Sequence, residues 1–302
     1  MKLFTKTSIL TASVVLSSLS LGIAPANAGS MYNGWNYTID SFNDGYNLGT
    51  IGENSNFEFY GMALTEVDDQ VYVGINSNLS LDGVSSSYAS DKHIGYGDLF
   101  FNFSGDNAQQ TQADSNFFGV HFATNSDSGA PELGVYTNVT GRNVAKANSG
   151  FRHLKHHRNS VSNKGGSASL GDLNQYGDAD AYFGNGYDTN YRLPNSIASG
   201  TKAGDIALLD GAALSSAGLD FGHFGASGNH TFGFSFDRDL LPDGDFMAHL
   251  FAECLNDGVV MAGNLAPYEE EPPTESVPEP TSALALLVVG GLGLLKRREQ
   301  AA

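Results

Sequence analysis

The sequence predicts an all-β protein, an antiparallel β-sandwich of jelly-roll kind with long loops rich in Gly, Asp and Asn. Three observations predict it. Many short segments alternate apolar residues with small or polar ones, as strands with one buried face do. Turn-forming clusters such as Asn43-Asp44-Gly45 and Asp82-Gly83 separate these segments. No stretch longer than two turns has a convincing helical period.

Two segments carry the clearest strand pattern. Every second residue of Thr231–Phe236 is Phe, and the residues between them are small or hydroxylated. In Phe246–Cys254 a second apolar set shares one face of the expected strand, namely Phe246, Ala248, Leu250, Ala252 and Cys254. We expect these two segments to pair as an antiparallel hairpin through the nine-residue loop 237–245.

Further segments show the same pattern between turn signals. They are Phe57–Leu64, Gln70–Ile75, Asp98–Phe103, Phe117–Ala123, Leu133–Val139, Asp205–Leu209 and Leu219–Phe224. Residues 140–200 are rich in Gly, Asn, Ser and Asp, and they fit either additional strands with long loops or a small subdomain.

The chain is strongly acidic, with a formal net charge of −18 over 302 residues. Such a charge repels phosphate backbones, which argues against nucleic acid as a partner and favours divalent cations or basic surfaces. Cys254 is the only cysteine, so no intramolecular disulfide can form. Stability must therefore come from packing, hydrogen bonds or bound ions. The 19 Phe and 13 Tyr supply enough apolar surface for a core and argue against disorder.

The N-terminus has the three-part pattern of a secretory signal peptide. Two lysines precede an apolar stretch, and the sequence Ala26-Asn27-Ala28 forms an A-x-A cleavage site. We expect signal peptidase to remove residues 1–28 after export by the Sec route, so that the mature chain begins at Gly29. The alternative is an N-terminal membrane anchor.

The C-terminus ends in a short apolar segment with a basic end. Thr281–Leu295 contains no charge, and its length as a helix would be about 22 Å, less than the roughly 30 Å of a hydrocarbon core. The positive-inside rule places the following basic residues, Lys296, Arg297 and Arg298, in the cytoplasm. Two prolines prevent a helix upstream, so Pro278-Glu279-Pro280 is expected to lie extended just outside the membrane.

The combination of Val277, Pro278, Glu279 and Pro280 with the apolar segment and the basic end resembles the PEP-CTERM sorting signal. The resemblance implies a Gram-negative host and an exosortase, a membrane protease that recognises a precursor inserted in the inner membrane. The protein would then reach the cell surface or the exterior. The alternative is a plain tail anchor. The expected organisation is a signal peptide (1–28), a β-sandwich domain (29–266), a Pro- and Glu-rich linker (267–276) and a sorting signal (277–302).

The body contains a set of motifs spread along the mature chain, namely Tyr37-Thr-Ile-Asp40-Ser, Ile75-Asn-Ser-Asn78-Leu, Ile94–Phe103, Gly171-Asp172, Gly204-Asp205, Phe232–Phe236 and Glu253–Gly258. In these motifs the body resembles the XDD-type exosortase-dependent surface proteins of cyanobacteria. This resemblance implies a delivery route and assigns no chemistry to the domain.

Four aspartates in one loop form a candidate calcium site. They are Asp237, Asp239, Asp243 and Asp245. A second pair, Asp178 and Asp180, lies in another expected loop. Neither pattern is an EF-hand, because the central Gly and the closing Glu are missing. The alternative is that these aspartates are solvated turn residues. No other cofactor is expected.

Other candidate groups point more weakly to chemistry. His153 and His157 would share a helix face and could bind a transition metal, but basic neighbours disfavour a cation. Cys254 and His249 fall on opposite faces of one expected strand, so Cys254 is interpreted as a small buried thiol. Asp257 is expected to bond backbone amides in the following turn.

Two further sets of residues could hydrolyse or bind glycans. A hydrolase would need two facing carboxylates, for which the candidates are Glu58, Glu66, Glu132 and Glu253. Aromatic residues could stack on sugars or fill the core, namely Tyr32, Trp35, Tyr37, Tyr182 and Tyr187. We therefore expect a non-catalytic structural component of the surface or extracellular matrix. The alternatives are a carbohydrate-binding module in contact with extracellular polysaccharide, or a glycan hydrolase.

Overall fold

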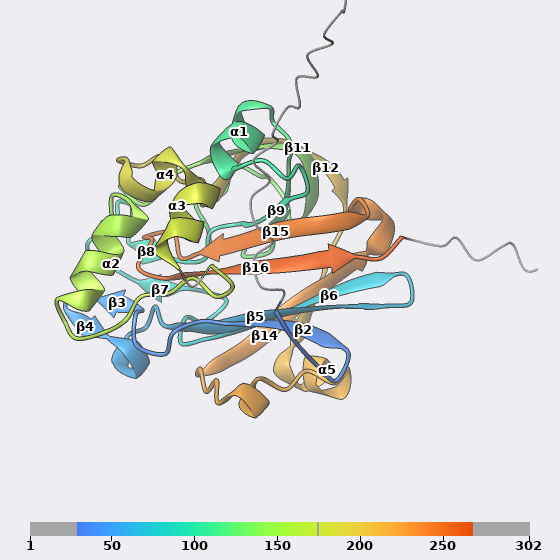
Figure 1. The fold of residues 1–302 in the computed structure, drawn as a ribbon, viewed down its shortest axis with the longest axis horizontal. Helices are drawn as coiled ribbons and strands as arrows, with labels where there is room; N and C mark the ends of the chain where they lie inside the picture. Colours follow the sequence, from blue (N-terminus) through green and yellow to red (C-terminus); the bar gives the residue numbers. More distant parts are fainter. Residues whose placement is uncertain (1–28, 174, 268–302) are drawn as a thin grey trace, which may run out of the picture. The chain divides into compact units, whose positions relative to one another are not determined.

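The computed structural model describes residues 29–173 and 175–267, and these form a two-layered antiparallel β-sandwich (Figure 1). Each layer is a sheet of six strands. The predicted fold class is confirmed. The residues expected to form the signal peptide, the sorting signal and its basic end lie outside the described residues.

The first sheet joins strands from both ends of the domain. Its order is β1 (Ser30–Tyr32), β2 (Trp35–Ile39), β5 (Phe59–Val67), β6 (Gln70–Ser77), β14 (His230–Asp237) and β13 (Ala207–Asp210). The segment with alternating Phe residues forms the strand β14, as predicted. Within it, Phe234 pairs with Val73, and the ring of Phe234 is fully buried between the sheets.

The second sheet lies opposite the first. Its order is β12 (Ser196–Gly204), β11 (Gly134–Arg142), β10 (Phe117–His121), β9 (Leu99–Asn102), β15 (Gly244–Phe251) and β16 (Gly258–Leu265). The last of these strands was not predicted. Its run Val259–Ala262 is apolar at every position because both of its faces are buried, so it lacks the alternation of a half-exposed strand.

Short elements occupy the connections. Two small ribbons pair β3 (Tyr46–Asn47) with β4 (Thr50–Ile51) and β7 (Val84–Ser85) with β8 (His93–Ile94). Three 3-10 turns are η1 (Gly52–Asn54), η2 (Phe221–Phe224) and η3 (Arg238–Leu240). The helices are α1 (Ala108–Ala113), α2 (Leu154–Ser162), α3 (Tyr176–Phe183), α4 (Asn185–Asp188) and α5 (Gly211–Ser216).

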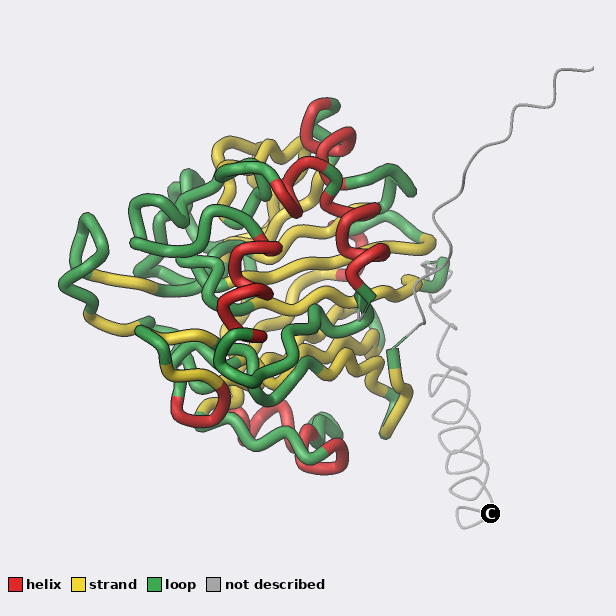
Figure 2. Tube along the Cα trace, turned by 60° about the vertical axis from the view of Figure 1, so that its left-hand side comes forward, coloured by secondary structure: helices red, strands yellow, loops and turns green. Residues whose placement is uncertain are grey.

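Three of these helices fall within residues 140–200 and pack on the outer face of the second sheet (Figure 2). The helix α2 has nine residues, more than two turns, although the sequence shows no convincing helical period of that length. It begins where the side chain of His153 accepts a hydrogen bond from the backbone N–H of His156. None of the helices in the described part of the chain is long and apolar enough to cross a membrane.

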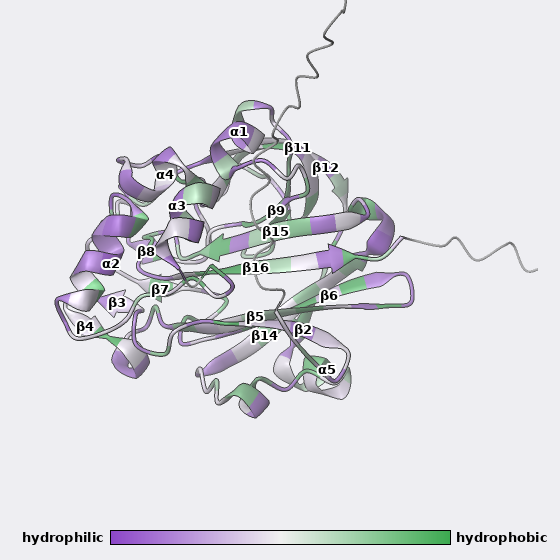
Figure 3. Ribbon diagram, viewed as in Figure 1, coloured by the Kyte–Doolittle hydropathy of each residue, from purple (hydrophilic) through white to green (hydrophobic). Residues whose placement is uncertain are grey.

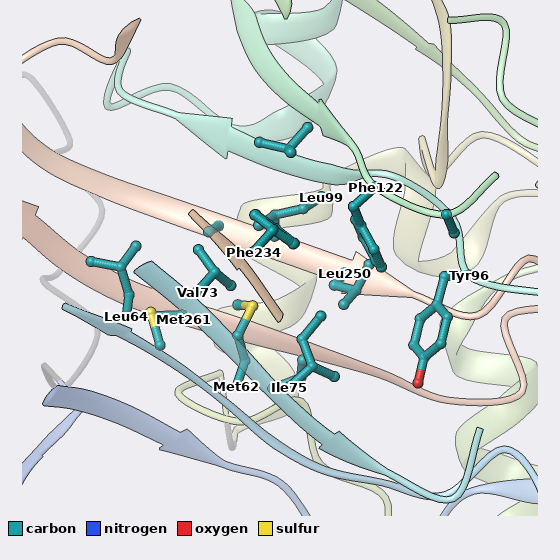
Figure 4. Close-up of a cluster of buried hydrophobic side chains, with 14 of the residues drawn as sticks. Met62, Leu64, Val73, Ile75, Tyr96, Leu99, Phe122, Phe234, Leu250 and Met261 are labelled. Atoms are coloured by element: carbon teal, nitrogen blue, oxygen red, sulfur yellow. The ribbon is translucent and has the colours of Figure 1, made fainter. Parts of the chain in front are cut away.

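The main core fills the space between the sheets (Figure 4). Met62, Val73 and Phe234 of the first sheet meet Leu99 and Leu250 of the second there, and all five are buried. Smaller apolar clusters lie on the two outer faces, under the helices on one side and under α5 and η2 on the other. Figure 3 shows the corresponding contrast, with hydrophilic colours over much of α2 and hydrophobic colours over the first half of β16.

Two sequence predictions about the strands are wrong. The hairpin expected between β14 and β15 does not form, because the loop 237–245 crosses from the first sheet to the second. Both strands turn an apolar face to the same core, and two such faces bury more surface opposite each other than side by side. Leu219–Phe224 is not a strand either: it ends in the turn η2, and Leu219 and Phe221 cover the outer face of the first sheet.

Candidate functional site

An open groove of about 1080 Å³ lies where the free edge of β16 meets the first sheet. Residues from β1, β2, β5, β9, β15, β16 and α3 line it, together with residues of the loops after β9 and before α3. Its apolar surface includes Leu64, Phe246 and Met247. Its polar residues comprise Asn36, Thr65, Glu66, Asn102, Asp106, Asp172, Gln175, Asp178, Asp245 and Asn264.

Side chains, not another strand, cover the edge of β16 beside this groove. Thr38 Oγ1 donates a hydrogen bond to the carbonyl of Val260 at 2.9 Å, and Asn36 Nδ2 donates to the carbonyl of Ala262 at 3.1 Å. The Ala262 N–H donates to Asp172 Oδ2 at 2.9 Å. Burial raises the pKa of Asp172 to about 6. The edge is therefore satisfied without a strand partner, and the groove above it is left open.

The polar wall of the groove combines acceptors with groups that both donate and accept. Gln175, Asp178 and Asn264 are exposed. Carboxylates accept only, whereas amides present a carbonyl and an NH₂ group. Asn264 Nδ2 donates to Asp245 Oδ1 at 2.8 Å, which orients both side chains. Such a wall can bond hydroxyl groups, and its negative charge would repel anionic ligands.

The four aspartates of the predicted calcium loop do not come together. Asp237, Asp239, Asp243 and Asp245 are all exposed. Asp237 Oδ1 accepts from Gln70 Nε2 at 2.5 Å, and Asp243 Oδ1 accepts from Arg238 Nη2 at 2.8 Å. Because Asp245 bonds Asn264, the carboxylates point to separate partners.

Arg238 explains the shape of this loop. Its side chain is only 2% exposed, and its guanidinium donates to Glu66 Oε2 at 2.7 Å and to the carbonyls of Leu241 and Ala266 at 2.8 and 2.6 Å. It thereby ties the crossing between the sheets to β5 and to the end of β16. A single basic residue within an acidic loop is the sequence signal for this role.

The histidines and the cysteine that the sequence singled out contribute to packing or helix capping. His157 is buried and its Nε2 lies 2.9 Å from the carbonyl oxygen of Asp44, and burial lowers its pKa to about 4. His153 caps α2, so the two do not form a metal pair. Burial among Phe rings lowers the pKa of His249 to about 3. The thiol of Cys254 is fully buried, and burial raises its pKa.

The four carboxylates considered for hydrolysis lie apart, each with its own partners. Glu66 bonds Arg238 as described, and Glu132 Oε2 accepts from Lys202 at the surface at 2.8 Å. Glu253 is buried, where it accepts from the backbone N–H groups of Gly95 and Asp127. Burial raises its pKa to about 7.

The aromatic residues considered for sugar stacking are mostly core residues. Trp35, Tyr37, Tyr182 and Tyr187 are buried, and Tyr32 is partly buried. Tyr182 lines the base of the groove, and its hydroxyl lies 3.1 Å from Nδ1 of His249.

The sequence did not reveal a cluster of buried carboxylates at one end of the sandwich. We call Asp40, Asp44, Glu58 and Asp257 the buried carboxylate cluster; each is at most 5% exposed. Asp40, Asp44 and Asp257 each offer one oxygen within 4.8 Å of the others, and they are the one such group that could hold a metal ion in residues 29–173 and 175–267. As predicted, Asp257 bonds backbone amides, those of Phe59 and Gly258 at 2.7 and 2.8 Å.

Burial shifts the pKa of every member of the cluster upward. It raises the pKa of Asp40 to about 6 and that of Glu58 to about 8. The pKa values of Asp44 and Asp257 also rise well above their usual range, first because of burial and then because the neighbouring carboxylates repel their charge.

The chain matches no protein-family model, no curated protein and no solved structure.

Proposed function

We propose that this chain is an exported protein of the cell surface or extracellular matrix, and that its β-sandwich is a non-catalytic component there. The secretory pattern of residues 1–28 and the PEP-CTERM-like pattern of residues 277–302 support the delivery route. Its partners in transit would be signal peptidase and an exosortase. The resemblance of the body to XDD-type exosortase-dependent surface proteins supports the same route.

One observation supports a non-catalytic role for the domain: the candidate catalytic groups already serve packing or backbone hydrogen bonding. Cys254 and His249 are enclosed in apolar clusters. Glu253 accepts hydrogen bonds from two backbone N–H groups. A nucleophile or a general base needs room for a substrate atom within hydrogen-bond reach, and these groups are buried.

The delivery route is tested by replacing Pro278, Glu279 and Pro280 together with alanine and locating the protein in cells. We expect the wild-type chain at the surface without its C-terminal tail, and the variant in the inner membrane with the tail intact. Replacing Pro272 and Pro273 of the linker provides a matched control that should behave as wild type. The same location and an intact tail in all three chains would refute the sorting proposal.

The groove favours a second candidate function, binding of a neutral glycan. A long open hollow with amides and carboxylates over an apolar base suits a chain of hydroxyl groups. The acidic side chains disfavour anionic polysaccharides. This binding mode relies on hydrogen bonds more than on stacking, because the aromatic residues near the groove are buried.

Glycan binding is tested with soluble neutral and anionic polysaccharides in affinity electrophoresis. The triple variant Gln175→Ala, Asp178→Ala and Asn264→Ala removes exposed polar groups of the groove. We expect it to lose most of the retardation by neutral glycans, while the control Tyr88→Ala, an exposed aromatic residue outside the groove lining, retains it. Equal retardation of both variants, or none of the wild type, would exclude the groove as a glycan site.

A further inference from the structure

We propose that the buried carboxylate cluster is a divalent-cation site of calcium type, with Asp40, Asp44 and Asp257 as ligands and Glu58 beside them. The proposal concerns a site distinct from the exposed loop 237–245 and is independent of how the protein is delivered. The positions of the four residues in the fold are the first observation that supports it.

The cluster lies where strands of both sheets begin or end. Asp40 follows β2, Glu58 precedes β5, and Asp257 precedes β16. The strands β2 and β5 are antiparallel neighbours in the first sheet, so the end of one meets the start of the other. Asp257 belongs to the second sheet and bonds the backbone of Phe59 in the first. An ion held here would link the two sheets.

Part of the cluster is fixed by hydrogen bonds from the backbone and from a serine. Asp40 Oδ1 accepts from Ser169 Oγ and from the Gly171 N–H at 2.7 and 2.8 Å. Asp44 Oδ2 accepts from the Ser169 N–H at 2.8 Å. Glu58 Oε2 accepts from the Gly45 N–H at 2.7 Å. One oxygen each of Asp40, Asp44 and Glu58 is therefore held in place, which orients the other, whereas both oxygens of Asp257 accept a backbone N–H.

The other oxygens of Asp40, Asp44 and Glu58 have no hydrogen-bond partner among the residues that the structure describes. Asp40 Oδ2, Asp44 Oδ1 and Glu58 Oε1 are buried and accept no hydrogen bond. Buried polar atoms are almost always paired, since an unpaired one loses its solvation without compensation. Three such oxygens in one cluster of closely spaced carboxylates indicate a missing positive partner.

The part of the chain that the structure describes places no Lys or Arg in an ion pair with the cluster. Within the described ranges, the ion pairs of Lys and Arg all involve other carboxylates. The ring of His157 is a nearby basic group, but its Nε2 lies 2.9 Å from the backbone carbonyl oxygen of Asp44 and contacts none of the carboxylates. A cation from solution would supply the missing charge.

The ligand chemistry favours calcium. Two ligands of Ca²⁺ on opposite sides of the ion are separated by about 5 Å, since each Ca–O distance is about 2.3–2.6 Å. The carboxylate oxygens of Asp40, Asp44 and Asp257 lie within 4.8 Å of one another and can share one such ion. A set of oxygen donors without a free thiolate or imidazole disfavours zinc. Mg²⁺ usually keeps several waters and is seldom enclosed by protein ligands alone.

The test uses the full chain after removal of metal with a chelator. We expect one equivalent of Ca²⁺ per chain in the reloaded protein by elemental analysis. The Tm should rise by about 5–10 °C at a calcium concentration about 100-fold above Kd, and by much less with equal Mg²⁺. Terbium should bind in place of calcium, and it should emit when nearby aromatic residues are excited. Tyr60, which interacts electrostatically with Glu58, is one of them.

Variants separate this site from the exposed loop. Asp44→Asn preserves the shape of the side chain and an acceptor for Ser169 but removes one charge. It should bind Ca²⁺ at least 10-fold more weakly and, in chelator, be at least as stable as wild type because repulsion is relieved. The double variant Asp237→Asn and Asp245→Asn is the matched control and should bind as wild type.

The proposal is overturned if the wild-type chain binds no calcium at 10 mM and its Tm does not respond. That result would mean that protons neutralise the cluster. It is also overturned if the loop variant loses the bound ion while Asp44→Asn retains it. The wild-type stoichiometry and Tm decide the question even if Asp44→Asn does not fold.

Discussion

The exposed loop 237–245 and the buried carboxylate cluster contain the same kind of residue in opposite physical situations. The aspartates of the loop are close in sequence, yet each is solvated or bonded to a partner of its own. The residues of the cluster come from distant parts of the chain, and they lie together with unpartnered oxygens. Density of acidic residues along a sequence thus does not show which carboxylates the fold buries together without partners.

The largest effect is expected from Arg238→Ala, which tests whether the loop is organised by its one buried cation and not by a metal. The change leaves Glu66 and the carbonyls of Leu241 and Ala266 without their donor. We expect a loss of about 3–5 kcal/mol in the free energy of unfolding, measured by urea denaturation. Asp239→Ala, an exposed neighbour in the same loop, is the control. A loss below 1 kcal/mol for Arg238→Ala would show that the loop is held in another way.

The next effect concerns the loop that closes the buried carboxylate cluster. Gly171 has a φ of +56°, and a Cβ there would lie 2.3 Å from Thr38 Oγ1 and 2.6 Å from the carbonyl oxygen of Val260. Gly171→Ala should cost about 2–4 kcal/mol and displace the N–H that bonds Asp40.

Gly34→Ala is the matched control for this substitution, because Gly34 also has a positive φ, +82°, but open space around it. It should cost about 1 kcal/mol, the strain of the backbone alone. Equal losses in the two variants, measured by thermal unfolding, would show that close packing over the cluster is unimportant.

Glu253 provides a third case, a buried carboxylate that is fully bonded, and it gives a pH dependence. Its pKa is about 7 in the folded chain against 4.5 for a free glutamate. The folded state therefore binds its proton more tightly than the unfolded state. Its contribution to stability is fully present below about pH 4.5 and is lost as the pH rises to about 7.

Glu253→Gln removes this titration, and comparison with wild type isolates it from other groups. The variant is destabilised at pH 5, where it places an NH₂ group against a backbone donor. That deficit should shrink by about 2–3 kcal/mol between pH 5 and pH 8. A deficit that stays constant over this range in urea titrations would mean that the glutamate is ionised throughout.

The smallest effect is expected from Asp237→Asn in the exposed loop. The side chain of Asp237 is exposed, and its hydrogen bond with the half-buried Gln70 lies at the surface. The substitution should change the free energy of unfolding by less than about 0.5 kcal/mol, with or without calcium. A loss above 2 kcal/mol that appears only with calcium present would show that the ion binds in this loop and not in the buried carboxylate cluster.

The sequence predicted the fold class and many strands because local alternation is a direct consequence of a half-buried strand. The Phe residues of Thr231–Phe236 are an example, and they form β14 as expected. Pairing could not be predicted in the same way. The short loop 237–245 suggested a hairpin, but the choice between a neighbouring strand and the opposite sheet depends on the total apolar area buried.

The same contrast between local sequence signals and long-range contacts applies to the candidate sites. Asp257 was correctly expected to bond backbone amides, since an aspartate before a strand has such amides nearby. Its proximity to Asp40 and Asp44 has no local signal. The groove likewise forms from seven separate elements, and no segment of the sequence outlines it.

By itself the sequence determined an acidic, disulfide-free, all-β chain, because charge, cysteine count and strand alternation are properties of single residues and near neighbours. Tertiary structure alone decided which strands share a sheet, where a groove opens, and which carboxylates lose water together. Those features depend on surface buried between distant segments, and burial turns Asp40, Asp44, Glu58 and Asp257 from ordinary acidic residues into a candidate binding site.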